Sequence, residues 1–333
     1  MSLHEPPTNM TKNPDRKQIA YGSMATHWLD CPICGSAAFE TLTSADRYRM
    51  GVRTCQCRGC GLAMTNPAPL AADLDAFYRN DYRRYYRGVD RPSPEHIEAY
   101  GLGVRAQSTS AFMANAKLLE SSPRVLDIGC ADGSLLRAIG ALAGQRVGVE
   151  PNPLFAEYAR SWADADVYGD LNEIEALGAT FDLIIINHVL EHVREPVPFL
   201  CRVAALCTAR GMIYVDVPDA TRYSSLDDLH IAHLFHFSTA SLQNIAHRAQ
   251  LHAMRIERHE PTRHPPSVRA VFAPGATAGA VITDAEASLV RQRIRRIGLL
   301  APVIRFRRSP LGRMLLNGPL GALRTLRQQQ NQT

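Results

Sequence analysis

The chain has 333 residues, of which 46% are hydrophobic and 21% are charged. These proportions are ordinary for a globular protein and exclude a collagen-like or largely disordered chain. The N-terminal stretch MSLHEPPTNMTKNPDRK is polar and proline-containing, unlike a signal peptide or a membrane anchor. No stretch approaches the roughly 18 apolar residues of a membrane-spanning helix. We therefore expect a cytoplasmic protein, in which cysteines stay reduced and favour metal binding over disulfides.

The net charge of +5 is unevenly distributed along the chain. From Ala253 onward, 14 arginines face four acidic residues, a net charge of +10, so the remainder carries 5 − 10 = −5. A mildly acidic body with a basic end predicts a docking region for an anionic partner or a membrane.

The first elements in chain order are two Cys-x-x-Cys-Gly pairs, Cys31/Cys34 and Cys57/Cys60. This spacing is typical of a zinc ribbon, in which four thiolates close a tetrahedral site and leave no open position for substrate. We expect these four cysteines to bind a structural Zn²⁺ ion. Cys55 is then the spare, because a Cys55/Cys57 pair would have the wrong spacing.

Residues 70–120 are predicted to be helical. Beyond them, short apolar runs alternate with amphipathic segments. The expected strands are RVLDIG, RVGVE, FDLIIIN and GMIYVDVP, and the expected helices are SLLRAIGALA, NPLFAEYARSWA and EPVPFLCRVAALC. This alternation indicates a parallel, doubly wound α/β sheet. LHAMRIERHE and PSVRAVFAP are expected to pair antiparallel, and residues 284–333 to be helical with interruptions at Pro302, Pro310 and Pro319.

The stretch VLDIGCADG joins the first expected strand of this sheet to its first helix. Gly129 permits the tight turn, and Gly133 lets the start of the helix pack close to the sheet. A dinucleotide-binding turn would have glycine where Ala131 stands, which argues against NAD or FAD. The carboxylate of Asp127 would repel a pyrophosphate but suit an ammonium group.

Two further acids follow later strands. Glu150 ends the second strand, where an acid can bind both hydroxyls of a ribose. Asp170 follows the expected third strand, where it can accept a hydrogen bond from an adenine amino group. A ligand with an adenosine and a cationic amino-acid end fits S-adenosylmethionine.

As an ordered set, DIGCADG, VGVE, YGDL and FDLIIINHVLEHV resemble the class I S-adenosylmethionine-dependent methyltransferases, over roughly residues 115–260. The resemblance implies a Rossmann-like fold and a methyl-transfer reaction. The cofactor-binding residues that it implies are Asp127, Gly129, Cys130, Gly133, Glu150, Pro151, Asp170, Leu171, Asn187 and His188. The alternative is a Rossmann-like domain whose glycines and acids serve only turns and surface.

The fourth strand is followed by His188, Glu191 and His192. Ubiquinone-pathway O-methyltransferases resemble this region, and their pattern ligates a divalent cation with a glutamate where His188 stands. This departure argues against such a metal site, and we expect His188 to face a substrate instead. Glu191 and His192 are then expected to cap the short helix and bond the backbone.

The stretch DDLHIAHLFHFS resembles D-x-I-Y-H-E-H-x-x-Y-F-S of the zinc-containing sugar C-methyltransferases. On that register His233 matches the functional histidine, and we expect it to be the general base, with His188 as second candidate. His230 and His236 replace the family's tyrosines and are expected to bind substrate. The alternatives for His230, His233 and His236 are a metal site and a purely structural role.

The same sugar-methylating group has tyrosines that help to close over cofactor and substrate, resembled here by FYRNDYRRYYRG. We expect substrate contacts from Tyr78, Tyr82 and Tyr86. The basic end, RQRIRRIGLLAPVIRFRRSPLGRMLL, has three interpretations: a helical face packed on the body, a membrane-surface helix, or a grip on nucleic acid. Its aromatics are not interleaved with the arginines, which argues against nucleic acid.

The sequence thus predicts an α/β, Rossmann-like methyltransferase. The expected divisions are a disordered leader (1–26), a zinc-ribbon module (27–66), a helical substrate cap (67–116), an S-adenosylmethionine-binding domain (117–276) and a basic helical tail (277–333). The expected reaction is histidine-assisted O- or C-methylation of a sugar, as nucleotide conjugate or glycan, or of another small biosynthetic intermediate. It is expected in the cytoplasm, or peripherally at the inner face of the membrane. The alternative functions are an RNA methyltransferase and a non-catalytic cofactor-binding assembly protein. No pattern predicts an oligomeric state.

Overall fold

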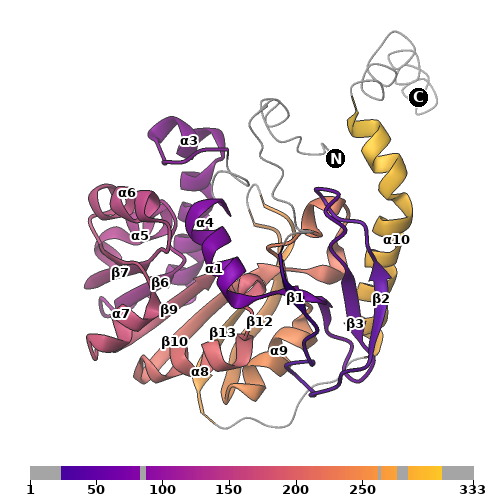
Figure 1. Ribbon diagram of the computed structural model, residues 1–333. Coiled ribbons are helices and arrows are strands. Elements are labelled where there is room, and N and C mark those ends of the chain that lie inside the picture. The colour runs from indigo at the N-terminus through magenta and orange to yellow at the C-terminus, as the bar shows by residue number, and fades with distance from the viewer. Residues whose placement is uncertain (1–23, 83–87, 262–263, 276–283, 310–333) are drawn as a thin grey trace, which may run out of the picture.

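A computed structural model describes residues 24–82, 88–261, 264–275 and 284–309 (Figure 1). Most of the expected disordered leader lies outside these ranges, as does the end of the expected basic tail with Pro310 and Pro319. Figure 1 shows two bodies side by side, a large sheet with its helices on the left and a smaller sheet flanked by a long helix on the right.

The larger body is built on a seven-stranded sheet in the order β12-β13-β10-β9-β6-β7-β8. Its strands are β6 (Arg124–Ile128), β7 (Gln145–Val149), β8 (Asp166–Tyr168), β9 (Phe181–Asn187), β10 (Cys207–Pro218), β12 (Leu251–His259) and β13 (Ser267–Pro274). The five strands from β10 to β8 are parallel, whereas β13 runs antiparallel to β10. The expected antiparallel pairing of β12 with β13 is confirmed. Strand order reverses between β6 and β9, where sheets of this kind bind ligands.

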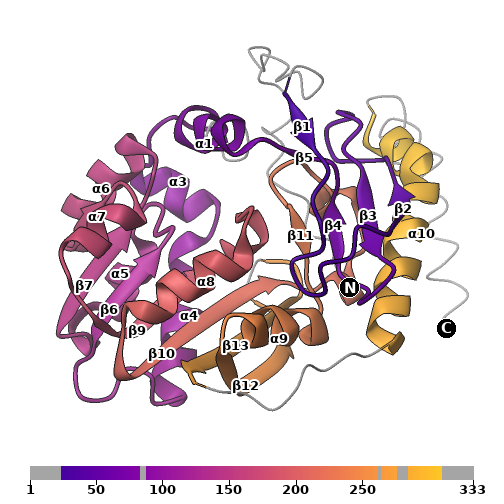
Figure 2. The ribbon, with the colours of Figure 1, turned by 60° about the horizontal axis from the view of Figure 1, so that its bottom comes forward.

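Both faces of this sheet are apolar because buried residues alternate between two cores. Val125 and Ile185 face one core, whereas Leu126 and Ile184 face the other. The first core is covered by α4 (Leu102–Asn115), α5 (Ser134–Ile139) and α6 (Pro153–Ala163). The second is covered by α7 (Leu171–Ala176), α8 (Pro196–Ala205) and α9 (Thr239–Arg248), of which α8 and α9 lie in front in Figure 2. Each fully buried aliphatic side chain contributes about 1.5–3 kcal/mol.

The cysteine module shares its sheet with a segment from far along the chain. The four-stranded antiparallel sheet has the order β11-β4-β3-β2. Its strands are β2 (Phe39–Thr43), β3 (Thr54–Cys57), β4 (Ala63–Thr65) and β11 (Phe235–His236), and β1 (Thr26–His27) pairs with β5 (Ala68–Pro69) beside it (Figure 2). Because β11 lies within DDLHIAHLFHFS, the module directly positions the histidine segment.

Helix α1 (Ala71–Asn80) and helix α3 (Pro94–Ala99) precede α4, so the predicted helical character of residues 70–120 is confirmed for these three segments. Three short 3₁₀ helices follow β9 and β10: η4 (Leu190–His192), η5 (Ala220–Arg222) and η6 (Leu226–Asp228). Helix η4 carries Glu191 and His192 directly after the fourth parallel strand, at the edge where the expected cofactor turn also lies.

Helix α10 (Asp284–Arg308) runs beside β2 on the right of Figure 1. The expected interruption at Pro302 is wrong, since the helix continues past it. Buried side chains on the inner face, including Ile294, Ile297 and Ala301, hold the helix through the position where proline removes a hydrogen bond. Its arginines Arg291 and Arg295 pair with Glu40 of β2. Within the described ranges, no helix combines the length and apolar character needed to cross a bilayer.

Candidate active site and metal centres

The turn from β6 to α5 is built on two glycines in the left-handed region, Gly129 with φ 77° and Gly133 with φ 79°. A Cβ on Gly129 would lie 2.5 Å from Cγ2 of Val189, and one on Gly133 would lie 2.9 Å from Cβ of Ala163. Both are far below an ordinary contact, so side chains are excluded at both positions. The turn therefore lies directly against the segment that follows β9.

Asp127 is 3% exposed near the end of β6. Burial, with the nearby carboxylates of Asp132 and Glu150, raises the pKa of its carboxyl to about 8. No hydrogen-bond donor to this carboxyl is found among the described residues. A cationic ligand group placed here would compensate the buried charge, and the ammonium of S-adenosylmethionine has the required charge.

Glu150 is 1% exposed at the end of β7 and fastens the turn. One of its oxygens accepts the backbone N–H of Ala131 at 3.1 Å, and the other accepts that of Asn152 at 3.1 Å. A carboxylate oxygen has two lone pairs, so a carboxylate at this position is of the kind that can accept from ribose hydroxyls. Asp170 is exposed and caps α7 by accepting the backbone N–H of Glu173 at 3.1 Å.

Three other expected cofactor residues also lie at this edge of the sheet, and one turns its side chain away from it. Asn187 ends β9, Pro151 is exposed directly after Glu150, and Leu171 begins α7. The side chain of Cys130 points into the core, where a Cβ on Gly148 would lie 2.6 Å from its sulfur. Only the backbone of Cys130 can then border a bound cofactor.

His188 follows β9 with φ 55° in the left-handed region. Its Nδ1 lies 3.3 Å from Oε1 of Glu191, and its Nε2 lies 3.8 Å from Oδ1 of Asp216. Its backbone N–H donates to the carbonyl of Asp216 at 2.8 Å. The imidazole thus lies between two carboxylates.

Asp216 lies on β10, and its side chain is 3% exposed. Its Oδ2 accepts the hydroxyl of Tyr214 at 3.0 Å and lies 2.9 Å from Nε2 of His259. Its Oδ1, which faces His188, is buried and has no hydrogen-bond partner among the described residues. Asp216 and His259 are not predicted from the sequence, because neither lies in a recognisable motif and only the sheet brings them to His188.

Glu191, His192 and His233 form a second group on the other side of Glu191. Each offers one ligand atom, and these atoms all lie within 4.8 Å of one another. Nε2 of His192 lies 3.8 Å from Oε1 of Glu191. From the sequence we expect Glu191 and His192 to cap a helix and bond the backbone. His192 does bond the backbone, through the carbonyl of Ala232 at 2.6 Å, but its other nitrogen faces this group.

His230 and His236 flank His233 from the interior. The ring centroid of His230 lies 3.8 Å from that of His233, and the centroid of His236 lies 6.4 Å from it. Burial lowers the pKa of His236 to about 3 and the pKa of His230 well below its usual range. The group with metal-ligand geometry joins His233 to Glu191 and His192, and does not include His230 or His236.

Two tyrosines of the expected cap cover the histidines. Tyr78 donates its hydroxyl to the carbonyl of Ala232 at 3.1 Å. The rings of Tyr78 and of Tyr82 each lie edge-on to the ring of His192, with centroids 5.8 Å apart. Burial raises the pKa of Tyr78 well above its usual range, so its hydroxyl stays protonated. Tyr86 lies outside the described residues.

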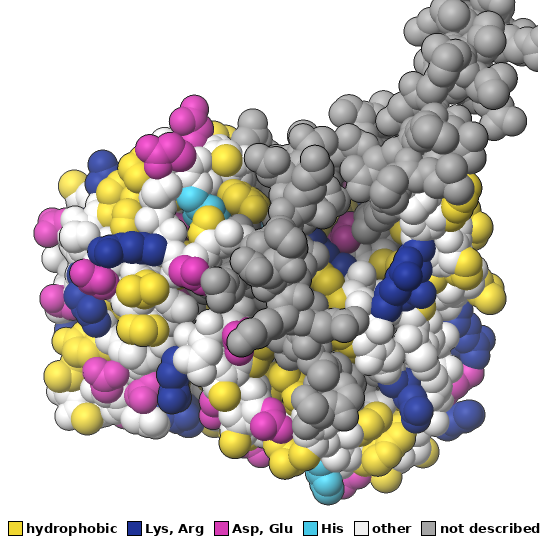
Figure 3. All heavy atoms as spheres, turned by 45° about the horizontal axis from the view of Figure 1, so that its top comes forward, with side chains coloured by type: hydrophobic (Ala, Val, Ile, Leu, Met, Phe, Trp, Pro, Cys, Tyr) yellow, Lys and Arg dark blue, Asp and Glu magenta, His cyan; other side chains and the backbone are white. Residues whose placement is uncertain are grey.

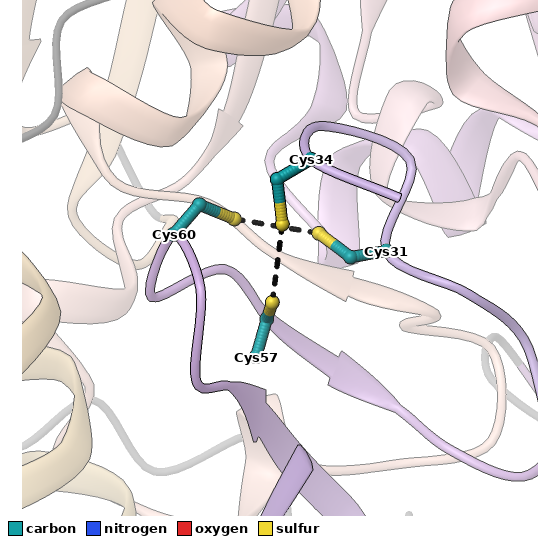
Figure 4. Close-up of side chains that lie close together, drawn as sticks. All are labelled: Cys31, Cys34, Cys57 and Cys60. Carbon is teal, nitrogen blue, oxygen red and sulfur yellow. Dashed lines mark hydrogen bonds between the residues drawn. The ribbon is translucent and has the colours of Figure 1, made fainter. Parts of the chain in front are cut away.

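The four expected zinc ligands converge on one point (Figure 4). The sulfurs of Cys31 and Cys60 lie 3.3 Å apart, and those of Cys34 and Cys57 lie 3.5 Å apart. A tetrahedral zinc ion with Zn–S bonds of about 2.3 Å would hold its sulfurs about 3.8 Å apart, so the group fits the ion. Cys55 lies outside it, as expected, and donates to the carbonyl of Asn66 at 3.3 Å.

The zinc-ribbon sheet is bonded directly to the histidine group. The hydroxyl of Thr65, on β4, donates to the carbonyl of His233 at 2.9 Å. The backbone N–H of Thr65 donates to the carbonyl of Leu234 at 2.8 Å, and the N–H of Leu234 donates to the carbonyl of Glu191 at 2.8 Å. Leu234 therefore links the segment of His233 to the backbone of Glu191, and Thr65 holds this segment against the zinc-ribbon sheet.

Comparison with known proteins identifies the class of the larger body. Residues 103–255 match a family model described as a methyltransferase domain. With the sheet order, the glycine turn and the acids at the strand ends, this match identifies the larger body as a class I S-adenosylmethionine-dependent methyltransferase domain.

Similar proteins with curated names are O-methyltransferases of ubiquinone biosynthesis. The chain is 33% identical over 104 residues to the one from Azorhizobium caulinodans, which covers 29% of this chain and 41% of that protein. It is 32% identical over 120 residues to one from Rhodopseudomonas palustris, covering 34% and 47%. The chain thus spans less than half the length of these relatives.

Solved structures with a similar fold include two methyltransferases. One is the Burkholderia thailandensis 1,6-didemethyltoxoflavin-N1-methyltransferase, with 17% identity, coverage of 64% of this chain and 96% of that one, and a TM-score of 0.47. The other is the magnesium protoporphyrin IX methyltransferase of Synechocystis, with 15% identity, coverage of 63% and 100%, and a TM-score of 0.45.

Proposed function

We propose that the protein transfers the methyl group of S-adenosylmethionine to a hydroxyl oxygen of a small biosynthetic intermediate. The observation that carries the proposal is the contact between the glycine turn and the segment that directly follows β9. Gly129 lies against Val189, so the expected methionine end of the cofactor adjoins His188. The curated names of the relatives support oxygen as the acceptor atom.

In the proposed reaction the acceptor oxygen attacks the sulfonium methyl in line. A C–O bond forms as the S–CH₃ bond breaks, and neutral S-adenosylhomocysteine leaves. The hydroxyl proton passes to Nε2 of His188, because Nδ1 already carries a hydrogen, which it donates in a hydrogen bond to Oε1 of Glu191. The carboxylate of Asp216, whose Oδ1 has no hydrogen-bond partner among the described residues, then stabilises the imidazolium. Positioning of the two reactants supplies most of the acceleration.

The structure favours His188 over His233 as the proton acceptor, the reverse of the order expected from the sequence. Burial and the nearby histidines His230, His192 and His236 lower the pKa of His233 well below its usual range. A proton placed on that ring would be unfavourable, whereas His188 has a carboxylate on each side.

Transfer of a labelled methyl group tests the proposal. The acceptor panel holds nucleotide-linked sugars, a glycan, RNA and, as other small intermediates, phenols with adjacent hydroxyls, so each acceptor class expected from the sequence has its own arm. We expect label in a small hydroxylated acceptor. His188→Gln should lower turnover by about 10²–10⁴-fold with S-adenosylmethionine binding retained. His252→Gln, on β12, is the matched histidine control. Cofactor binding with no transfer to any acceptor would refute the proposal.

For the cysteine group we propose a structural Zn²⁺ ion that fixes the module and, through β4 and β11, the histidine segment. Hydrogen bonding with Cys57 raises the pKa of Cys31 to about 12, so the four sulfurs need a cation before all can be thiolates. Zinc content of the reduced protein is the measurement. Cys57→Ser should lose the metal and Cys55→Ser should keep it, and equal loss in both would contradict the assignment.

The outer face of α10 supports the proposed membrane contact. Leu299, Val303 and Phe306 share this face and are 81%, 51% and 47% exposed. Exposed arginines Arg296 and Arg307 flank them, and Figure 3 shows basic and apolar side chains together at this edge. We propose that this face adsorbs to an anionic membrane surface.

Sedimentation with vesicles tests this contact. The full chain should bind phosphatidylserine-containing vesicles and not neutral ones, and Leu299→Glu should weaken binding. Deleting the helix would be uninformative, because its inner face is part of the core. Equal binding by the variant would remove the membrane role.

A further inference from the structure

We infer that Asn152 is a positioning residue, which couples a bound cofactor to the histidine segment (residues 227–238) through helix α1. Asn152 is 7% exposed and lies two residues after Glu150, in the loop that borders the expected ribose position. The inference goes beyond the proposed function, because it requires cofactor binding by the methyltransferase domain and no particular acceptor.

Asn152 makes hydrogen bonds with its backbone and with both ends of its side chain. Its backbone N–H donates to Oε1 of Glu150 at 3.1 Å. Its Oδ1 accepts the backbone N–H groups of Leu154 and Phe155, each at 3.1 Å, and so caps α6. Its Nδ2 donates to the carbonyl of Arg79, in the last turn of α1, at 3.2 Å. The side-chain oxygen thus serves the cofactor side, whereas the side-chain nitrogen reaches the cap.

Three successive residues of α1 join the two sides of the site. Phe77 is 2% exposed and belongs to the same apolar cluster as Ala232 of the histidine segment. The hydroxyl of Tyr78 donates to the carbonyl of Ala232 at 3.1 Å. Arg79 follows, and its carbonyl accepts from Asn152. One turn of helix therefore contacts the histidine segment and the loop after β7 together.

Helix α1 is short and depends on such contacts for its position. It has 10 residues, and its N-cap Leu70 makes no side-chain capping bond. Isolated helices shorter than about 12–15 residues are marginal in water. Figure 2 shows α1 between the helices of the larger body and the strands of the zinc-ribbon module. The bond from Asn152 fixes the end of the helix that lies toward the larger body.

A ligand at Glu150 acts on α1 through this bond. Ribose hydroxyls bonded to the Glu150 carboxylate hold the loop to which Asn152 belongs, and Nδ2 then keeps the carbonyl of Arg79 in place. A ligand shifts a conformational equilibrium only through contacts that differ between the two states, and the bond from Asn152 is such a contact. Because Tyr78 is bonded to Ala232, the histidine segment is steadied with the helix.

Hydrogen–deuterium exchange of the full, zinc-loaded chain, with and without saturating S-adenosylhomocysteine, tests the inference without an acceptor. In wild type the ligand should slow exchange of the α1 amides and of residues 231–235 by about fivefold, the factor that one net hydrogen bond contributes to an equilibrium. Asn152→Asp keeps the oxygen that caps α6 and removes the donor to Arg79. It should lose the slowing in both segments and keep it at the turn of Gly129. Asn115→Asp, at the exposed end of α4, is the matched control.

Equal slowing in wild type and Asn152→Asp would overturn the inference, as would wild-type α1 amides that do not respond to the ligand. Asn152→Ala removes the cap of α6 as well, so a loss seen only in that variant would assign Asn152 to capping alone and also overturn it. Binding of S-adenosylhomocysteine by each variant shows that it is folded.

Turnover is measured separately. With an acceptor, Asn152→Asp should raise the acceptor KM by about fivefold and leave kcat and the cofactor KM unchanged, because a smaller fraction of the protein then has its cap in place. A protein that shows ligand-dependent slowing and transfers no methyl group would refute the proposed function and leave the role of Asn152 standing.

Discussion

Asp127 allows the cofactor pocket to be tested through pH. Its carboxyl has a pKa of about 8 in the cofactor-free protein, chiefly because it is buried. Pairing with the ammonium of S-adenosylmethionine requires the ionised form. Ionising a group of pKa about 8 at pH 7 costs about 1.4 kcal/mol, which is a tenfold loss of affinity, and the cost grows by the same amount for each pH unit below.

Affinity for S-adenosylmethionine should therefore rise about tenfold from pH 6 to pH 7, below the α-amino pKa of about 7.7–8.0. Binding in this window should release close to one proton. Titration calorimetry in two buffers of different ionisation enthalpy measures both quantities. Asp127→Asn should bind more weakly at pH 7 and lose both the slope and the proton release. A wild-type affinity that does not change with pH, or an equal slope in Asp127→Asn, would show that Asp127 does not pair with the ammonium of the cofactor.

The same shift has a consequence for folding. Because the folded pKa lies above the usual 3.8, the protonated carboxyl contributes stability that is complete at low pH and is lost as the pH rises toward about 8. Without cofactor, Asp127→Asn should gain free energy of unfolding relative to wild type as the pH rises through this window. Denaturant unfolding at several pH values measures the difference between the two proteins.

Three further predictions concern the turn, the module and the brace. Gly129→Ala should lower the free energy of unfolding by about 1–3 kcal/mol more than Gly178→Ala does. Both glycines have positive φ, but only a Cβ on Gly129 would meet a neighbour within 4 Å, so equal losses would contradict the contact. Cys57→Ser should lower the melting temperature and methyl transfer together, since zinc loss frees β11, whereas Cys55→Ser should keep zinc and turnover. Thr65→Val removes the hydroxyl that donates to the carbonyl of His233 and should lower the free energy of unfolding by about 1 kcal/mol with cofactor affinity unchanged. An unaltered free energy of unfolding would count against the brace.

The parts of this structure that the sequence predicted are those encoded by local spacing. The strand-to-helix turn with Gly129 and Gly133 lies where the motif placed it, and the four zinc-spaced cysteines converge. The alternating strands and helices form the expected doubly wound sheet, because apolar runs of this length must be buried on both faces.

The parts that it missed depend on contacts between distant segments. Asp216 and His259 lie near His188 only because β10, β13 and β12 are neighbours in the sheet. No periodicity in the sequence predicts that strand order. The sequence predicts only a capping role for Glu191 and His192, because the third member of their group, His233, is distant in the chain. Pairing of β11 with β4 brings His233 to them in the fold. Pro302 was expected to interrupt a helix that tertiary packing holds together.

In the proposed reaction His188 accepts a proton from a hydroxyl group as that oxygen is methylated. The most direct measurement is transfer of isotopically labelled methyl from S-adenosylmethionine to the hydroxylated acceptor panel, comparing wild type with His188→Gln at saturating cofactor. We expect a labelled methyl ether with wild type, and loss of turnover without loss of cofactor binding in the variant. Equal turnover by the two proteins, or no methyl ether from wild type, would contradict it.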